Sequence, residues 1–237
     1  MSRRLPISAC LFDLDGTLAD TAPDLATAMN RVRAEHGLAS LPLNVLRPMA
    51  SHGARGLLQV GMNITADDPR YPALKDSFLA YYLAAIDEQT RLFEGIGALI
   101  IRLHEIGIPW GIVTNKLSTY TVPLVNRLPW PHPPACVVSG DTAAHPKPAP
   151  DSLLYAADQL NQPPQHCIYV GDDLRDIQAA HAAGMHAIAA AYGYCGDSAP
   201  QTWKADAIIA HPLELLACDL MSRTYELRAN PRMQGVQ

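Results

Sequence analysis

A short apolar run that ends abruptly in acidic residues most constrains how this chain can fold. Ala9 to Phe12 is followed directly by the segment DLDGT, residues 13–17. An apolar run bounded by a glycine turn predicts a buried strand, and residues two apart on a strand share one face. Asp13 and Asp15 are therefore expected close together at the carboxyl end of this strand. A divalent cation that prefers oxygen ligands, as Mg²⁺ does, would relieve their repulsion. The alternative is an acidic turn that only caps a strand.

Strand and helix patterns alternate along the chain from about Phe93 onward. Further apolar runs predict strands over Trp110–Val113, Cys136–Ser139, Cys167–Val170, His186–Ala190 and Ala207–Ala210. Apolar residues at helical spacing predict helices over Ile96–Ile106, Asp151–Leu160 and Leu174–Ala183, with a last one near Leu213–Leu220. Such alternation implies a parallel sheet covered by helices on both faces.

The segment between Asp20 and Arg91 differs, because it contains helical patterns and no strand pattern. Helices are expected over Ala22–His36, Gly56–Met62 and Tyr71–Ile86. We therefore expect a separate helical module inserted after the first strand. The expected division is a core of residues 1–18 and 92–237 and a helical cap of residues 19–91. Residues after about 224 are expected to form a flexible tail.

Three more of the expected strands end in residues with useful chemistry. Thr114 and Asn115 follow one, Lys147 lies in the loop after the next, and the third is followed by Asp172, Asp173 and Asp176. Each has an ordinary explanation alone, since Thr, Asn and Asp cap helices and loops carry lysines. Together they place hydroxyl, amide, ammonium and carboxylate groups at strand ends that converge on one crevice. A hydroxyl, an amide and free backbone N–H groups there suit phosphate oxygens.

Composition excludes several other classes of protein. The 237 residues are 49% apolar with a net charge of −5, which argues against nucleic acid or a membrane surface as a partner held by bulk charge. No apolar stretch approaches the ~20 residues of a membrane span, and Pro6–Phe12 is too short for a secretory leader. The five scattered cysteines predict reduced thiols in the cytoplasm, and the nine ungrouped histidines disfavour a zinc site.

The motifs in this order resemble the four motifs of the haloacid dehalogenase superfamily, over about residues 6–216. The insertion after the first motif resembles the subgroup whose cap lies there. Within it, the chain is similar to phosphoglycolate phosphatases and to N-acetylmuramic acid 6-phosphate phosphatases. Supporting stretches are residues 21–24, 92–95, 113–116 and 191–194, while residues 171–176 and 203–212 resemble the second group slightly more. The fold class expected is α/β, a Rossmann-like doubly wound parallel sheet with an inserted all-helical cap domain.

The resemblance implies a phosphatase that works through a covalent intermediate. Asp13 would be the nucleophile that forms an aspartyl-phosphate, and Asp15 the general acid and base. Mg²⁺ would be held by Asp13, the Asp15 backbone carbonyl and Asp172.

The resemblance also implies how the phosphate is held. Thr114, Asn115 and Lys147 would bind the transferring phosphoryl group. Asp176 would orient Lys147 or a metal-bound water, with an exposed first-turn helix acid as the alternative. Asp173 is a further possible supporting residue, or only a helix cap.

Substrate choice is expected to belong to the cap. Gly53 lets the backbone approach a ligand, and Arg55 can pair with an anion such as a carboxylate on the leaving group. A solvated surface arginine is the alternative for Arg55. His52, directly before Gly53, is more often structural than catalytic.

The leading hypothesis is a Mg²⁺-dependent phosphomonoesterase acting on a small phosphorylated metabolite with a carboxylate, 2-phosphoglycolate first. The alternative is N-acetylmuramic acid 6-phosphate, in peptidoglycan recycling, and a sugar-phosphate mutase stays open. A dehalogenase is disfavoured because that chemistry has no leaving alcohol for Asp15 to protonate. A signalling receiver domain would need its phosphorylated Asp on an intermediate strand, where none is suitable, and a non-catalytic scaffold would not fill every chemical position. A cytoplasmic monomer or homodimer is expected.

Overall fold

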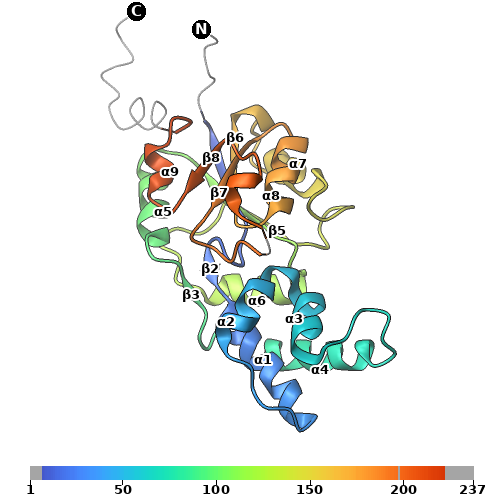
Figure 1. Cartoon of the computed structure of the whole chain (residues 1–237). Helices are drawn as coiled ribbons and strands as arrows, with labels where there is room; N and C mark the ends of the chain where they lie inside the picture. Colours follow the sequence, from blue (N-terminus) through green and yellow to red (C-terminus); the bar gives the residue numbers. More distant parts are fainter. Residues whose placement is uncertain (1–6, 197, 222–237) are drawn as a thin grey trace, which may run out of the picture.

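A parallel sheet forms the centre of the molecule (Figure 1). The computed structural model describes residues 7–196 and 198–221. Within them six strands pair in the order β5-β4-β1-β6-β7-β8. Their bounds are β1 Ala9–Phe12, β4 Trp110–Val113, β5 Cys136–Val138, β6 Cys167–Gly171, β7 His186–Ala190 and β8 Ala207–Ile209. Every strand pairing in this six-stranded sheet is parallel. The predicted α/β fold class is thus confirmed.

The first strand lies in the middle of the sheet and is buried on both faces. Cys10 and Phe12 face one apolar cluster, which includes residues of α5 (Ile96–Glu105) and α9 (Glu214–Ala217). Ala9 and Leu11 face the other, with residues of α7 (Asp151–Gln159) and α8 (Leu174–Ala182). This period of two explains why the strand reads as an unbroken apolar run.

The helical module lies between two very short strands, β2 (Ala19–Asp20) and β3 (Arg91–Leu92), which pair antiparallel. It contains α1 (Ala22–Glu35), α2 (Leu43–Leu46), a 3₁₀ turn over Arg47–His52, α3 (Gly53–Met62) and α4 (Tyr71–Ala84). Figure 1 shows these four helices grouped together beyond the carboxyl edge of the sheet. The module therefore stands where it can cover that edge.

Two buried polar groups hold the ends of the module, one to the core and one to each other. The hydroxyl of Tyr194 accepts hydrogen bonds from the backbone N–H groups of Thr21 (2.7 Å) and Ala22 (2.9 Å), at the start of α1. The carboxylate of Asp24, 2% exposed, accepts from the backbone N–H and the hydroxyl of Thr90, just before the chain returns to the core. The start and the end of the insertion are thereby hydrogen-bonded to each other.

Some elements differ from the sequence prediction. Helix α6 (Ser118–Arg127) is not predicted, because Pro123 inside it interrupts the pattern of a regular helix. The last helix, α9, has four residues where about eight are expected. The predicted tail after about residue 224 lies outside the described residues. Among the helices that the structure does describe, none has the length and apolar character needed to cross a bilayer.

Candidate active site

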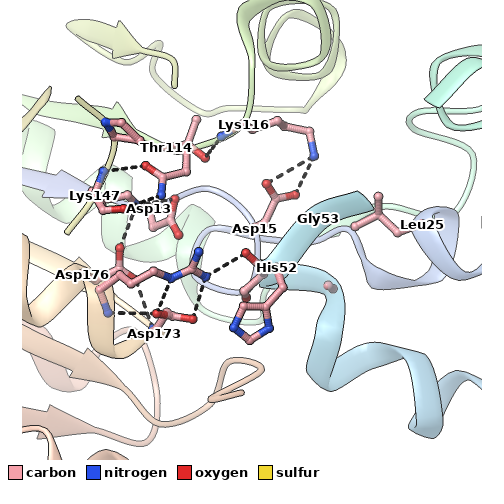
Figure 2. Close-up of a pocket in the computed structure, with 15 residues that line it drawn as sticks. Asp13, Asp15, Leu25, His52, Gly53, Thr114, Lys116, Lys147, Asp173 and Asp176 are labelled. Atoms are coloured by element: carbon pink, nitrogen blue, oxygen red, sulfur yellow. Dashed lines mark hydrogen bonds and ion pairs between the residues drawn. The ribbon is translucent and has the colours of Figure 1, made fainter. Parts of the chain in front are cut away.

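A cavity of about 320 Å³ opens where the carboxyl edge of the sheet meets the helical module (Figure 2). The core lines it with Asp13, Asp15, Thr114, Asn115, Lys116, Pro146, Lys147, Asp173, Arg175 and Asp176. The module lines it with Leu25, Ala50, Ser51, His52 and Gly53. The sequence-predicted convergence of four strand ends on one crevice is therefore present, apart from Asp172, which lies fully buried beside it.

Lys147 bridges two of the carboxylates. Its ammonium lies 3.0 Å from Asp13 Oδ1 and 2.7 Å from Asp176 Oδ1, and it donates to the hydroxyl of Tyr169 at 2.7 Å. Burial by itself lowers the pKa of Lys147, but the charges of Asp13 and Asp176 outweigh it and raise the pKa overall. Lys147 is thus a fixed cation, 4% exposed, at the floor of the cavity.

The side chain of Asn115 positions this lysine. Its amide donates to the carbonyl of Lys147 at 2.9 Å and accepts from the N–H of Lys147 at 2.9 Å. Thr114 next to it is 3% exposed, and its hydroxyl accepts from the N–H of Lys116 at 3.2 Å. These two bonds use one of the two N–H donors of the Asn115 amide, so a contact from Asn115 to phosphate can come from the other side-chain N–H or from its backbone.

Asp13, Asp172 and Asp176 each offer an oxygen to one small space, where the three oxygens lie within 4.8 Å of one another. Burial, opposed by Lys147 and reinforced by Asp176 and Asp15, raises the pKa of Asp13 to about 7. Burial and the charges of Asp13 and Asp176 hold the pKa of Asp172 well above its usual range. A cluster of oxygen ligands with more negative charge than Lys147 neutralises is the donor set that Mg²⁺ prefers. The residues fit a divalent cation.

Asp172 is held in place by residues that the sequence did not single out. Its carboxylate accepts from the hydroxyl of Thr17 and from the backbone N–H of Tyr194, both at 2.9 Å. Gly16 has a φ of +82°, and a Cβ there would lie 2.2 Å from Asp172 Oδ2. The DLDGT segment thus needs its glycine for close approach of backbone to this carboxylate, as well as for the turn.

Asp15 faces a different direction from Asp13. Figure 2 shows its carboxylate turned toward Lys116, whose ammonium lies 2.9 Å from Oδ1 and 3.2 Å from Oδ2. The hydroxyl of Thr21 donates to the same carboxylate. Lys116 is not among the predicted site residues, and its position directly after Thr114-Asn115 is the only signal the sequence offers for it.

Asp173 and Asp176 form the N-terminal cap of α8. Asp173 accepts from the backbone N–H of Arg175, and Asp176 accepts from the backbone N–H of Asp173. Asp173 therefore caps α8, and it also lines the cavity. Asp176, at 1% exposure, is not the exposed helix acid given as its alternative. Asp176 contacts both the backbone at the N-terminus of α8 and the Lys147 ammonium.

Arg175 is a second residue that the prediction missed. Its Nε and Nη2 donate to the two carboxylate oxygens of Asp173, both at 2.8 Å. Its Nη2 also donates to the carbonyl of Ser51 at 2.9 Å. Burial alone would raise the pKa of Asp173. The hydrogen bonds and charge of Arg175 outweigh burial, so the pKa of Asp173 lies below its usual value. This ion pair joins the edge of the core to the module.

The two cap residues proposed for substrate choice lie in different places. Gly53 lines the cavity and has a φ of +56°. Arg55 is exposed and does not line the cavity, because α3 turns Gly56, Leu57 and Leu58 inward and leaves Arg55 on its outer side. His52 lines the cavity, and its buried Nδ1 has no hydrogen-bond partner in the described residues.

Comparisons with known proteins agree with this geometry. Residues 10–190 match the family described as haloacid dehalogenase-like hydrolase. The chain is 43% identical over 208 residues, 87% of its length and 94% of the relative's, to a phosphoglycolate phosphatase of Xanthomonas campestris pv. campestris. It is 36% identical over 222 residues, 93% of its length and 97% of the relative's, to an N-acetylmuramic acid 6-phosphate phosphatase of Pseudomonas aeruginosa. The crystal structure of a predicted phosphoglycolate phosphatase from Haemophilus somnus superposes with a TM-score of 0.79 at 25% identity, covering 89% of this chain and 97% of that one.

Proposed function

This chain belongs to the haloacid dehalogenase-like hydrolases and is an enzyme of their phosphatase class, and from that premise we propose its reaction. It hydrolyses a small carboxylate-bearing phosphate ester, 2-phosphoglycolate in the first place, through an aspartyl-phosphate on Asp13. The observation that carries this proposal is the arrangement of Asp13 between the Lys147 ammonium at 3.0 Å and the oxygens of Asp172 and Asp176.

The reaction divides into two displacements at phosphorus. A carboxylate oxygen of Asp13 forms a bond to phosphorus while the bond to the leaving oxygen breaks, and Asp15 gives that oxygen a proton. Asp15, now a carboxylate, then takes a proton from water as the water oxygen bonds to phosphorus. The bond between phosphorus and Asp13 breaks, which frees phosphate and returns both aspartates to their starting forms.

The surrounding residues hold the phosphoryl group. Lys147, with Thr114 and the backbone of Asn115, presents positive charge and donors at a buried site, where electrostatic placement is strongest. A Mg²⁺ ion would be held by the carboxylates of Asp13 and Asp172 and the backbone carbonyl of Asp15, and when bound it would offset the charge between nucleophile and phosphate.

The helical module, residues 19–91, is proposed as the cap that excludes water and selects the leaving group. The cavity it covers, about 320 Å³, lies at the low end of small-molecule sites, ~300–1,000 Å³. Arg175 is the cation that the cavity offers away from Lys147 and Lys116. Its observed side-chain hydrogen bonds use three of the five guanidinium N–H donors, which leaves donors for a substrate carboxylate. Gly53 would bring backbone against the same part of the ligand.

N-acetylmuramic acid 6-phosphate is the second candidate substrate, because the relative with that name aligns over 97% of its own length. Its lactyl carboxylate presents the same charge to the cavity as 2-phosphoglycolate does. We further propose a cytoplasmic enzyme that acts as a monomer or homodimer.

A panel of phosphate monoesters tests the proposal. With Mg²⁺ present, kcat/KM is expected to be highest for 2-phosphoglycolate or for N-acetylmuramic acid 6-phosphate, and lower for alkyl phosphates whose alkyl group carries no charge. The covalent step is tested by adding glycerol as a competing acceptor. A common aspartyl-phosphate predicts the same ratio of phosphate to glycerol phosphate from every substrate, and ratios that differ between substrates would contradict it.

A further inference from the structure

Lys116 occupies a position in the cavity that neither phosphate binding nor the metal site explains. Its ammonium lies on both carboxylate oxygens of Asp15, at 2.9 and 3.2 Å, and not on Asp13 or Asp176 in the observed contacts. The side chains of Lys116 and Asp15 are 9% and 12% exposed. A buried pair at this distance fixes the orientation of both partners more firmly than a surface pair does.

The backbone of Lys116 is held at both of its polar groups. Its N–H donates to the Thr114 hydroxyl, and its carbonyl accepts from Gly140 N–H at 2.8 Å and from the Thr121 hydroxyl at 2.9 Å. The origin of the side chain is therefore rigid, and what remains adjustable is the position of its ammonium.

The Lys116 ammonium also contacts the cap. It lies 4.6 Å from the ring centroid of Tyr82, a residue of α4 that is 1% exposed. An ammonium this close to an aromatic face is attracted by the ring's quadrupole. Tyr82 in turn packs near Tyr120 of α6, with ring centroids 6.1 Å apart. The chain of contacts runs from the cap helix through Lys116 to Asp15.

We propose that Lys116 is a positioning residue for proton transfer: it holds the Asp15 carboxylate in its working orientation, and Tyr82 makes that orientation depend on how the cap is seated. The inference rests on the proposed function, in which Asp15 is the general acid and base. The carboxylate form of Asp15 is the one that exists after the leaving oxygen has taken its proton and before water gives one back. The contacts of Lys116 and the Thr21 hydroxyl hold this carboxylate in one orientation.

The test uses two aromatic phosphate esters whose organic groups carry no charge and whose leaving groups differ in their need for a proton. Benzyl phosphate releases a poor leaving group that must be protonated, whereas p-nitrophenyl phosphate releases a stable phenolate. The quantity measured is the ratio of their kcat/KM values, which reports only the steps up to formation of the aspartyl-phosphate. Because both activities come from the same folded molecules, the ratio is independent of how much of a variant folds.

Lys116→Met is expected to lower this benzyl-to-nitrophenyl ratio by roughly tenfold or more, within the loss that misplacing a reacting group by about 1 Å produces. Asp15→Asn should lower it further, by about 10²-fold or more. Tyr82→Leu should shift the ratio in the same direction by less, and Tyr82→Phe, which keeps the ring, by less still. Lys116→Arg keeps the charge and should recover part of the effect. Lys75→Met, an exposed lysine on α4, is the matched control.

The outcomes separate the inference from the proposed function. If Lys116→Met slows both substrates equally while Asp15→Asn changes the ratio, the lysine binds phosphate or only supports the fold, and the inference fails alone. If Asp15→Asn leaves the ratio unchanged, the acid assignment in the proposed function fails, and the inference with it. If Tyr82→Leu leaves the ratio unchanged while Lys116→Met lowers it, the dependence on the cap is wrong.

Discussion

The core side and the module side of the cavity are lined by different kinds of residue. The core side carries charged groups that are almost fully buried, with Asp13 at 8%, Lys147 at 4% and Asp176 at 1% exposure. The module side consists of an apolar pair, Leu25 and Ala50, a stretch of backbone around Gly53, and one ionisable side chain, His52. The core side can do chemistry on any phosphate ester, whereas the module side can distinguish esters only by shape and by the few polar groups at the junction.

This difference in lining predicts that the core side sets the rate of turnover and that the junction with the module selects the substrate. Substitutions on the core side should change turnover of all substrates together, because all present the same phosphoryl group. Substitutions at the junction should change some substrates and spare others. The following predictions test that division, beginning with the largest effect.

Asp13→Asn is expected to abolish turnover, by on the order of 10⁴-fold or more, because an amide is a poor nucleophile at phosphorus. The fold should survive, since Lys147 keeps its contact with Asp176 at 2.7 Å. Steady-state assays of purified protein and a thermal melt by circular dichroism measure the two effects. More than a few per cent of residual activity would remove Asp13 from the role of nucleophile.

Chelation of divalent cations should lower activity on every substrate by roughly 10³-fold, the scale of several kcal/mol of charge stabilisation. Mg²⁺ should restore it, while Ca²⁺ should inhibit, since calcium takes more ligands at longer distances. The experiment is an EDTA titration followed by addition of each metal. Full activity in excess EDTA would contradict a cation at Asp13, Asp15 and Asp172.

Lys147→Ala should lower kcat/KM for esters with and without a carboxylate alike, by on the order of 10²-fold, as loss of one preorganised donor does. It should also destabilise the protein by about 3–5 kcal/mol, because Asp13 and Asp176 lose the buried cation between them. Chemical denaturation and kcat/KM for two substrates provide the measurements. A loss confined to one substrate would move Lys147 from the phosphoryl site to the leaving-group site.

The sequence predicts the core side well and the junction poorly, for a physical reason. Apolar runs that stop at polar residues mark all six sheet strands to within a residue, and the ends of parallel strands must converge. Lys147, Asp172 and Asp176 therefore come together as the motifs indicate. Local pattern also finds the cap helices α1 and α4, though not the Pro-containing α6.

The junction depends on how two separately folded parts meet, which no local pattern encodes. Arg175 of the core reaches Ser51 of the module across 124 residues, and Lys116 of the core contacts the ring of Tyr82 in the module. The same limit applies to Arg55. An arginine beside two glycines suggests anion binding, but the turn of α3 places it on the outer side of the module.

The smallest and most informative prediction compares Arg175 with Arg55. Arg175→Ala should lower kcat/KM for 2-phosphoglycolate by roughly ten- to a hundredfold, which corresponds to about 1.5–3 kcal/mol for a hydrogen-bonded charge. It should spare 2-hydroxyethyl phosphate, which has a hydroxymethyl group where the carboxylate stands. Stability should change by no more than about 1 kcal/mol, because the pair with Asp173 is partly exposed and the backbone N–H at position 175 still donates to the capping carboxylate of Asp173.

Arg55→Ala serves as the matched control, and both kcat/KM values should stay within about threefold of wild type, as expected for a solvated surface side chain. Arg175→Lys should recover only part of the loss, since an ammonium cannot reproduce a forked contact. If Arg55→Ala produced the selective loss instead, the cap would have to close further than the present arrangement, bringing the outer side of α3 to the ligand. If Arg175→Ala slowed both esters equally, the arginine would act only by joining core to module, and recognition of the carboxylate would fall to His52 and the backbone at Gly53.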